Sequence, residues 1–249
     1  MTTAAKPQAI KRKRLAIGND KGGVFKSGLT RGIAHAIPDC VIVEIDSAHR
    51  LLEYEHRTRF HRMRVDRALV EESGGSASRA EFDGVLNDLA GLSEPLVMDI
   101  GANTAVALLE ELKRVGPSFA KLGIEVSVLT IVTADPSAIT EAERCLRVAD
   151  GLASKRFVIE NRVLGPVDAG VLARLGKGAT VTVMPKFEID TEVWGIFGAG
   201  GFEAIDRLSD SKLTERFGFA RADRIKRDLH RLRQQVLEVV EPASRWLIS

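Results

Sequence analysis

The sequence is poor in cysteine and has no long apolar run. Its two cysteines, Cys40 and Cys145, lie far apart and form no CxxC pair. This argues against a disulfide framework, a zinc ribbon and a thiolate-held iron–sulfur cluster, and we expect a reducing compartment. No apolar stretch approaches the ~20 residues of a membrane-spanning helix. The basic N-terminus lacks the apolar core of a secretory signal, so we expect a cytoplasmic protein without a membrane role.

The net charge is also small. The formal value of +2 is too small to imply a nucleic-acid partner by itself. The distribution is more informative, because basic residues gather in three clusters, at 11–14, 57–67 and 221–233.

Short apolar runs, each followed by a helix-like stretch, organise the chain of 249 residues. The runs cover residues 15–17, 41–43, 96–98, 126–132, 157–159 and 181–184. Runs that are continuous rather than alternating suit strands buried on both faces of a parallel sheet. We therefore expect an α/β fold, with a doubly wound, mostly parallel sheet flanked by helices. Residues 1–10 are expected to be a flexible tail, and 11–249 a single domain.

Three other segments carry local signals. Residues 73–76 predict a turn or flexible loop before a helix around 81–89, and Gly195 to Gly201 predict a glycine-rich break. Apolar residues at spacings of three and four predict a C-terminal helix over 219–241, ended by Pro242 and carrying a basic face.

The segment after the first apolar run has the features of a phosphate cradle. It consists of Lys21, Gly22, Gly23, Val24, Phe25, Lys26, Ser27 and Gly28. Glycines allow backbone N–H groups to converge on an anion at a helix N-terminus. Lys26 would reach the β/γ-phosphates, and the Ser27 hydroxyl would bind Mg²⁺. Asp20 and Phe25 occupy the glycine positions of the ordinary GxxxxGK[ST] motif, and the alternative is a turn that binds nothing.

With a lysine before the double glycine, this segment resembles the deviant Walker A motif KGGxGK[ST] of the ParA/MinD family of P-loop ATPases. In that family the position of Asp20 is variable, and Asn19 suits the partition branch, whereas Phe25 is a departure. Further landmarks follow in order: Glu44 to Asp46 resembles the DxD strand end, 96–99 the Walker B strand, and 157–161 the strand that ends in an adenine-binding Asn. The resemblance spans about residues 14 to 190.

The resemblance implies a role for each matching residue. Lys21 would contact phosphates across an ATP-dependent homodimer, Asp46 would orient the attacking water, and Asp99 would hold Mg²⁺ through water. Asn161 would hydrogen-bond the adenine of ATP. Taken alone, Asp46 and Asp99 are equally explained as caps of the following helices, and Asn161 as a turn-forming residue.

The resemblance also implies nonspecific DNA binding and a DNA-bound adaptor protein that stimulates hydrolysis. The side chains that could supply the DNA contacts, besides the C-terminal helix, are His56, Arg57, Arg59, His61, Arg62, Arg64 and Arg67. The alternative is a solvated basic face. A MinD-like membrane helix is not expected, because residues 242–249 are too short.

The leading hypothesis is therefore a slow Mg²⁺-dependent ATPase that acts as a dimerising switch in plasmid or chromosome partition, or in conjugative transfer, as in the StbB-like plasmid branch. Phe25 motivates an alternative, an adaptor of the same fold that binds nucleotide weakly or does not hydrolyse it. A metabolic ATP-dependent enzyme on this fold is a third possibility.

Overall fold

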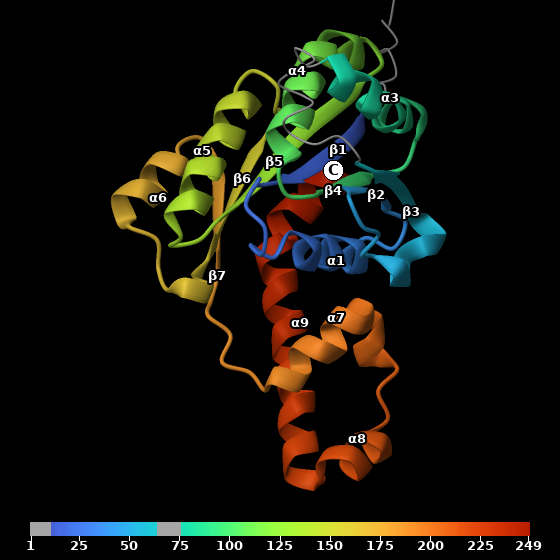
Figure 1. The fold of residues 1–249 in the computed structure, drawn as a ribbon, viewed down its shortest axis with the longest axis vertical. Helices are drawn as coiled ribbons and strands as arrows, with labels where there is room; N and C mark the ends of the chain where they lie inside the picture. The colour runs from blue at the N-terminus through green and yellow to red at the C-terminus, as the bar shows by residue number, and fades with distance from the viewer. Residues whose placement is uncertain (1–10, 64–75) are drawn as a thin grey trace, which may run out of the picture.

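A single parallel sheet forms the centre of the computed structural model, which describes residues 11–63 and 76–249 (Figure 1). Its seven strands lie in the order β3-β2-β4-β1-β5-β6-β7, and every neighbouring pair is parallel. The strands are β1 (Arg12–Gly18), β2 (Val41–Asp46), β3 (Thr58–Arg62), β4 (Leu96–Ile100), β5 (Ile124–Val132), β6 (Arg156–Asn161) and β7 (Thr180–Met184). The predicted α/β fold is confirmed.

Helices cover both faces of the sheet (Figure 1). One face packs against α1 (Lys26–Ala36) and α9 (Phe219–Ile248), while α7 (Thr191–Asp206) and α8 (Asp210–Phe217) pack against α9, below the sheet in Figure 1. The other packs against α3 (Ser76–Gly91), α4 (Ala105–Lys121), α5 (Pro136–Ala149) and α6 (Ala169–Leu175). Short 3₁₀ turns, η1 (Leu52–Arg57) and η2 (Arg162–Leu164), complete the described elements.

Burial along β1 shows why a continuous apolar run becomes a central strand. Leu15 and Ile17 contribute to the core under α1 and α9, and Ala16 between them contributes to the core under α3 and α4. All three side chains are fully buried. Because successive side chains of a strand point to opposite faces, a strand covered on both sides must be apolar at every position.

One strand, β3, was not predicted. It lies at the edge of the sheet, and its sequence TRFHR has one apolar side chain among polar ones. Edge strands need not be apolar, and charged residues there discourage pairing with other chains. Most of the loop predicted at 73–76 lies outside the described residues. Arg64, Arg67 and the tail predicted at 1–10 lie entirely outside them.

The structure corrects one predicted helix boundary. Pro242 does not end the C-terminal helix, because α9 runs from Phe219 to Ile248. The proline removes its own N–H from the helix, while Ala243 and Leu247 beyond it are buried and hold the last turns in place. The predicted glycine-rich break at Gly195 to Gly201 is confirmed at its end: the backbone of α7 leaves helical geometry at Gly200 and Gly201, which separate two helical pieces.

The N-terminal basic cluster, residues 11–14, is part of the fold. Arg12 donates to the carbonyls of Ala90 (2.7 Å) and Leu122 (2.9 Å), at the ends of α3 and α4. The ammonium of Lys13 donates to the carbonyl of Trp246 at 2.9 Å, at the end of α9. Cations at helix C-termini satisfy otherwise unpaired carbonyls and oppose the negative end of the helix dipole.

Arg14 is the most buried member of the cluster. Its side chain is fully buried and donates to the carbonyls of Leu89 (2.9 Å), Glu94 (2.8 Å) and Leu92. Burial lowers the pKa of this guanidinium to about 10. The guanidinium therefore satisfies the carbonyls at the end of α3 and in the turn that leads into β4.

We predict that Arg14→Met destabilises the protein by about 3 kcal/mol or more, because it leaves several buried carbonyls without a donor. The matched control is Lys11→Met, which removes only the exposed Lys11–Glu125 ion pair and should change stability by less than about 1 kcal/mol. Urea unfolding followed by circular dichroism measures both. Equal effects of the two variants would contradict the structural role of Arg14.

Candidate functional site

A cleft of about 340 Å³ opens at the carboxyl ends of β1, β2 and β4, beside the N-terminus of α1. In open α/β sheets, ligands bind at the carboxyl ends of the strands. The predicted cradle lines the cleft together with residues from β2, β4 and α7. The lining side chains and backbone belong to Gly22, Gly23, Val24, Phe25, Lys26, Ser27, Gly28, Arg31, Asp46, Arg50, Ile100, Ala102, Trp194, Phe197 and Gly198.

Two buried polar side chains hold the cradle in shape. The Asn19 amide donates to the carbonyls of Ile131 (2.7 Å) and Ala138 (3.0 Å), and its oxygen accepts the backbone N–H of Lys21 at 2.8 Å. The Lys26 ammonium donates to the carbonyls of Asn19 (2.7 Å) and Lys21 (3.0 Å). The loop is thereby fixed to β5 and α5 on one side and closed by its own lysine on the other.

Asp20 fixes the cradle to the start of α4. Its carboxylate accepts the backbone N–H of Ala105 at 2.6 Å, at the first turn of α4. Its backbone carbonyl accepts the N–H of Asn103 at 3.2 Å. Burial raises the pKa of Asp20, although the backbone N–H groups of Ala105 and Val106 oppose the shift. A residue that departs from the ordinary Walker pattern is therefore used as a helix cap.

Asp99 is buried beside two residues of the cleft lining, Lys26 and Ser27. Burial lowers the pKa of Lys26 and raises the pKa of Asp99 to about 6, while the hydroxyls of Ser27 and Thr30 stabilise the Asp99 carboxylate. A hydroxyl beside a carboxylate provides the oxygen donors that Mg²⁺ prefers, with phosphate and water for the remaining positions. The described residues contain no group of three or more His, Cys, Asp or Glu side chains able to hold a metal alone. The donors present therefore fit a metal that arrives with a phosphate ligand.

Phe25 takes over the backbone role of the missing glycine. It adopts φ 82° and ψ 24°, the left-handed conformation that glycine usually provides. Its ring lies over Gly28, where an added Cβ would stand 2.3 Å from a ring carbon. The cradle thus has the turn that the motif requires, and Gly28 provides the space for the ring.

Helix α7 holds the Phe25 ring on its other side. Phe197 stacks on it at a centroid distance of 6.0 Å, and Trp194 contacts it edge to face, also at 6.0 Å. Aromatic pairs at such distances contribute about 0.5–1.5 kcal/mol beyond their buried area. We infer that these contacts offset the strain of the left-handed Phe25, which is of the order of 1–3 kcal/mol.

The two acidic residues of β2, Glu44 and Asp46, lie in different environments. Glu44 is buried, and its carboxylate accepts the backbone N–H of Arg50 at 2.6 Å and bonds His49. Asp46 reaches the cleft, where it forms an ion pair with Arg50 at 3.2 Å. Gly101, after β4, lies so close that a Cβ there would stand 2.8 Å from the Asp46 carboxyl carbon. The end of β4 thus approaches the side chain expected to orient water.

Lys21 and Asn161 occupy positions that leave their predicted roles untested. The Lys21 ammonium lies 3.4 Å from Asp135, at the start of α5, and its side chain is 42% exposed. The Asn161 amide donates to the Val24 carbonyl at 3.2 Å and accepts the N–H of Val163 at 3.1 Å. Asn161 therefore joins β6 to the cradle. The contact of Lys21 across a dimer and that of Asn161 with adenine stay predictions.

Sequence reasoning missed four residues that line the cleft beside the predicted ones. Arg31, Arg50, Trp194 and Phe197 all line it. Arg31 pairs with Glu53 at 2.5 Å and lies 5.4 Å from the Phe197 ring centroid. The available signal was the position of Trp194 and Phe197 within a glycine-rich segment.

Many of the basic residues considered for DNA binding have partners within the chain. Arg57 donates to the carbonyls of Ala34 (2.8 Å) and Ile37 (3.1 Å), at the end of α1, and His61 pairs with Asp88 at 2.8 Å. His56, Arg59 and Arg62 are exposed. On α9 the ion pairs are Arg221–Asp190, Lys226–Asp210, Arg227–Asp223, Arg231–Asp228 and Arg233–Asp206. The predicted basic face of α9 is therefore extensively neutralised.

No protein-family model and no curated protein matches the sequence. Among solved structures, the ATP complex of an Asp-to-Ala variant of McdA from Cyanothece is similar, with 16% identity and a TM-score of 0.47, covering 93% of this chain and 97% of that chain. Apo McdA from Cyanothece is 13% identical with a TM-score of 0.43, covering 87% of this chain and 99% of that chain. Both likenesses are distant.

We predict that Gly28→Ala destabilises the protein by about 1–3 kcal/mol, because the new methyl group must displace the Phe25 ring. In a Phe25→Gly background the same change should be neutral or stabilising by up to about 1 kcal/mol, since alanine favours helix. Gly116→Ala in α4 is the control, because no atom lies within 4 Å of its added Cβ. Urea unfolding of the four-variant cycle gives the coupling, and additive effects would contradict the placement of the ring.

We predict that Asp99→Asn stabilises the nucleotide-free protein at pH 8 by an amount on the order of 1–3 kcal/mol. Folding raises the pKa of Asp99 from 3.8 to about 6. The charged form therefore disfavours folding above pH 6, and this cost disappears as the pH falls toward 4. Urea unfolding in EDTA at pH 8, 7, 6 and 5 should show the advantage of the variant shrinking with pH. A less stable variant at pH 8 would refute the buried, charged carboxylate.

Proposed function

We propose that the protein binds MgATP in the cleft beside α1 and hydrolyses it slowly. The observation that carries this proposal is the combination of a fixed loop in front of α1 with Lys26, Ser27 and Asp99 at its base. Backbone N–H groups at a helix N-terminus favour a polyphosphate, and Lys26 supplies the compensating positive charge.

The chain's own residues divide the remaining tasks. Ser27 and Asp99 would hold Mg²⁺, which neutralises charge on the phosphates during transfer. Asp46 lies at the same cleft and is the proposed acceptor that orients the attacking water. Such chemistry depends mainly on position and charge, so a slow hydrolase needs few further groups.

The ParA-like biological role is a proposal that rests on the resemblance of the sequence motifs. It comprises an ATP-dependent homodimer with Lys21 at its interface, nonspecific DNA binding, and a stimulating adaptor protein in partition or conjugative transfer. Among the described candidates on the basic surface, the exposed side chains His56, Arg59 and Arg62 are those best placed to contact DNA. In the described part of the chain, no helix is long and apolar enough to span a membrane.

A non-hydrolysing adaptor of the same fold is the second candidate. In the sequence, Phe25 is the reason to consider such an adaptor, because it places a bulky side chain where the loop turns. Its glycine-like backbone preserves the turn of the loop, and its ring packs on α7 within the cleft lining. Whether the protein turns over ATP separates the two candidates.

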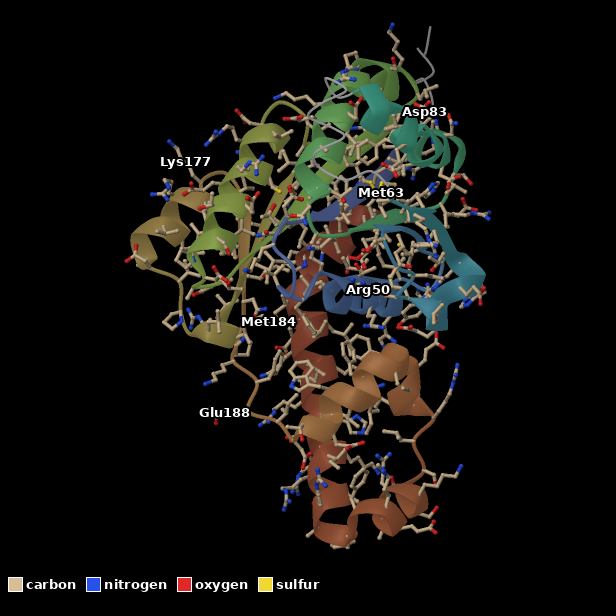
Figure 2. All side chains as sticks on the ribbon, viewed as in Figure 1. Arg50, Met63, Asp83, Lys177, Met184 and Glu188 are labelled. Atoms are coloured by element: carbon tan, nitrogen blue, oxygen red, sulfur yellow. The ribbon has the colours of Figure 1, made fainter. Side chains whose placement is uncertain are left out.

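Titration with a fluorescent ATP analogue tests binding. We predict Mg²⁺-dependent binding, weakened about 10-fold to 100-fold by Lys26→Ala through loss of a charge-assisted contact. Ser27→Ala should reduce the dependence on Mg²⁺. Lys177→Ala is the control, because Lys177 is exposed on the loop between α6 and β7 (Figure 2). No binding by the wild type, or equal loss in Lys26→Ala and Lys177→Ala, would refute the proposed site.

A further inference from the structure

Arg50 enters the cleft from a fixed piece of main chain (Figure 2, beside α1). Its backbone N–H donates to the buried carboxylate of Glu44 at 2.6 Å, and its carbonyl accepts from the Arg31 guanidinium at 3.3 Å. The Arg50 side chain is nevertheless 59% exposed. The anchored backbone therefore aims a largely solvated guanidinium at the cleft.

The two arginines of the cleft lining are held very differently. Arg31 forms an ion pair with Glu53 at 2.5 Å, and its side chain is only 9% exposed. Arg50 pairs through Nε with Asp46 at 3.2 Å. A guanidinium has five N–H donors, so Arg50 keeps donors for a second anion while Arg31 is committed to the fold.

The partner of Arg50 is the carboxylate expected to orient water. An arginine bound to Asp46 competes for the lone pairs that would accept a hydrogen bond from water. Phosphate oxygens are strong competitors for guanidinium, which matches their geometry with two parallel hydrogen bonds. A triphosphate in the cradle brings such oxygens into the cleft that Arg50 lines together with Lys26 and Ser27.

We propose that Arg50 is a terminal-phosphate ligand supplied by the same chain, which leaves Asp46 for the phosphate when ATP binds. The exchange frees the Asp46 carboxylate to accept a hydrogen bond from the attacking water. It also places a positive charge where negative charge is redistributed during phosphoryl transfer. This inference rests on the proposed MgATP binding and extends it to the recognition of the third phosphate.

The step that Arg50 assists is ordinary hydrolysis. The water oxygen forms a bond to the γ-phosphorus, and the bond between that phosphorus and the β–γ bridging oxygen breaks. The electron pair of the broken bond leaves with ADP. A water proton passes to the released phosphate, so that Asp46 and Arg50 are unchanged at the end.

Equilibrium binding of two nucleotides tests the proposal without turnover. The Kd values of ADP and of the non-hydrolysable triphosphate AMP-PNP are measured with Mg²⁺ for the wild type, Arg50→Gln, Arg50→Lys and Arg147→Gln. Arg147 is exposed on α5, away from the residues that line the cleft. Thermal unfolding of each variant confirms that it is folded.

The proposal expects Arg50→Gln to weaken AMP-PNP binding about 10-fold to 100-fold and ADP binding less than about 3-fold. Arg50→Lys should retain part of the preference for the triphosphate, and Arg147→Gln should match the wild type. Equal weakening of both nucleotides, or no weakening of either, overturns the role of Arg50 while leaving the nucleotide site intact. A wild type that binds neither nucleotide overturns the proposed function and this inference together.

Discussion

The site depends on a hydrogen-bond network that fixes the backbone of the cradle. Asn19 connects the loop to the end of β5, Asp20 connects it to the start of α4, and Lys26 closes it from within. Each of these polar groups is largely or fully withdrawn from water, so each carries a cost unless its partners are in place. The network fixes the backbone of the loop in front of the N-terminus of α1, where backbone N–H groups favour an anion.

Burial at the same site opposes the charges that the site needs. The pKa of Lys26 is lowered and the pKa of Asp99 is raised by desolvation, so both charged forms are disfavoured by the fold alone. Perturbed groups of this kind gather at functional sites because a ligand of matching charge recovers the cost. A polyphosphate with Mg²⁺ supplies both signs at once, which is why the proposed ligand follows from the electrostatics of the cleft.

Elsewhere in the molecule, several basic side chains bind the C-terminal carbonyls of helices and are not free to contact a partner molecule. Arg12 and Lys13 satisfy the carbonyls at the ends of α3, α4 and α9, and Arg57 does the same for α1. Basic clusters in a sequence are easily interpreted as nucleic-acid surfaces, but parallel sheets flanked by helices have many helix C-termini to satisfy. The number of basic residues in a sequence cluster therefore overstates how many of them are free to bind a nucleic acid.

The sequence by itself determined the parts that depend on local pattern. Continuous apolar runs predicted six of the described strands, and the acidic residues that end these runs were predicted as site residues. The glycine–lysine segment after β1 located the cradle. Tertiary structure decided the rest, since contacts between distant segments outweighed local signals. Phe25 is tolerated because α7 packs on its ring, α9 continues past Pro242 because its last turns are buried, and Arg50 meets Asp46 because Glu44 and Arg31 hold its backbone. Phe25 and Phe197, like Arg31 and Arg50, are far apart in the sequence, and only folding brings them into contact.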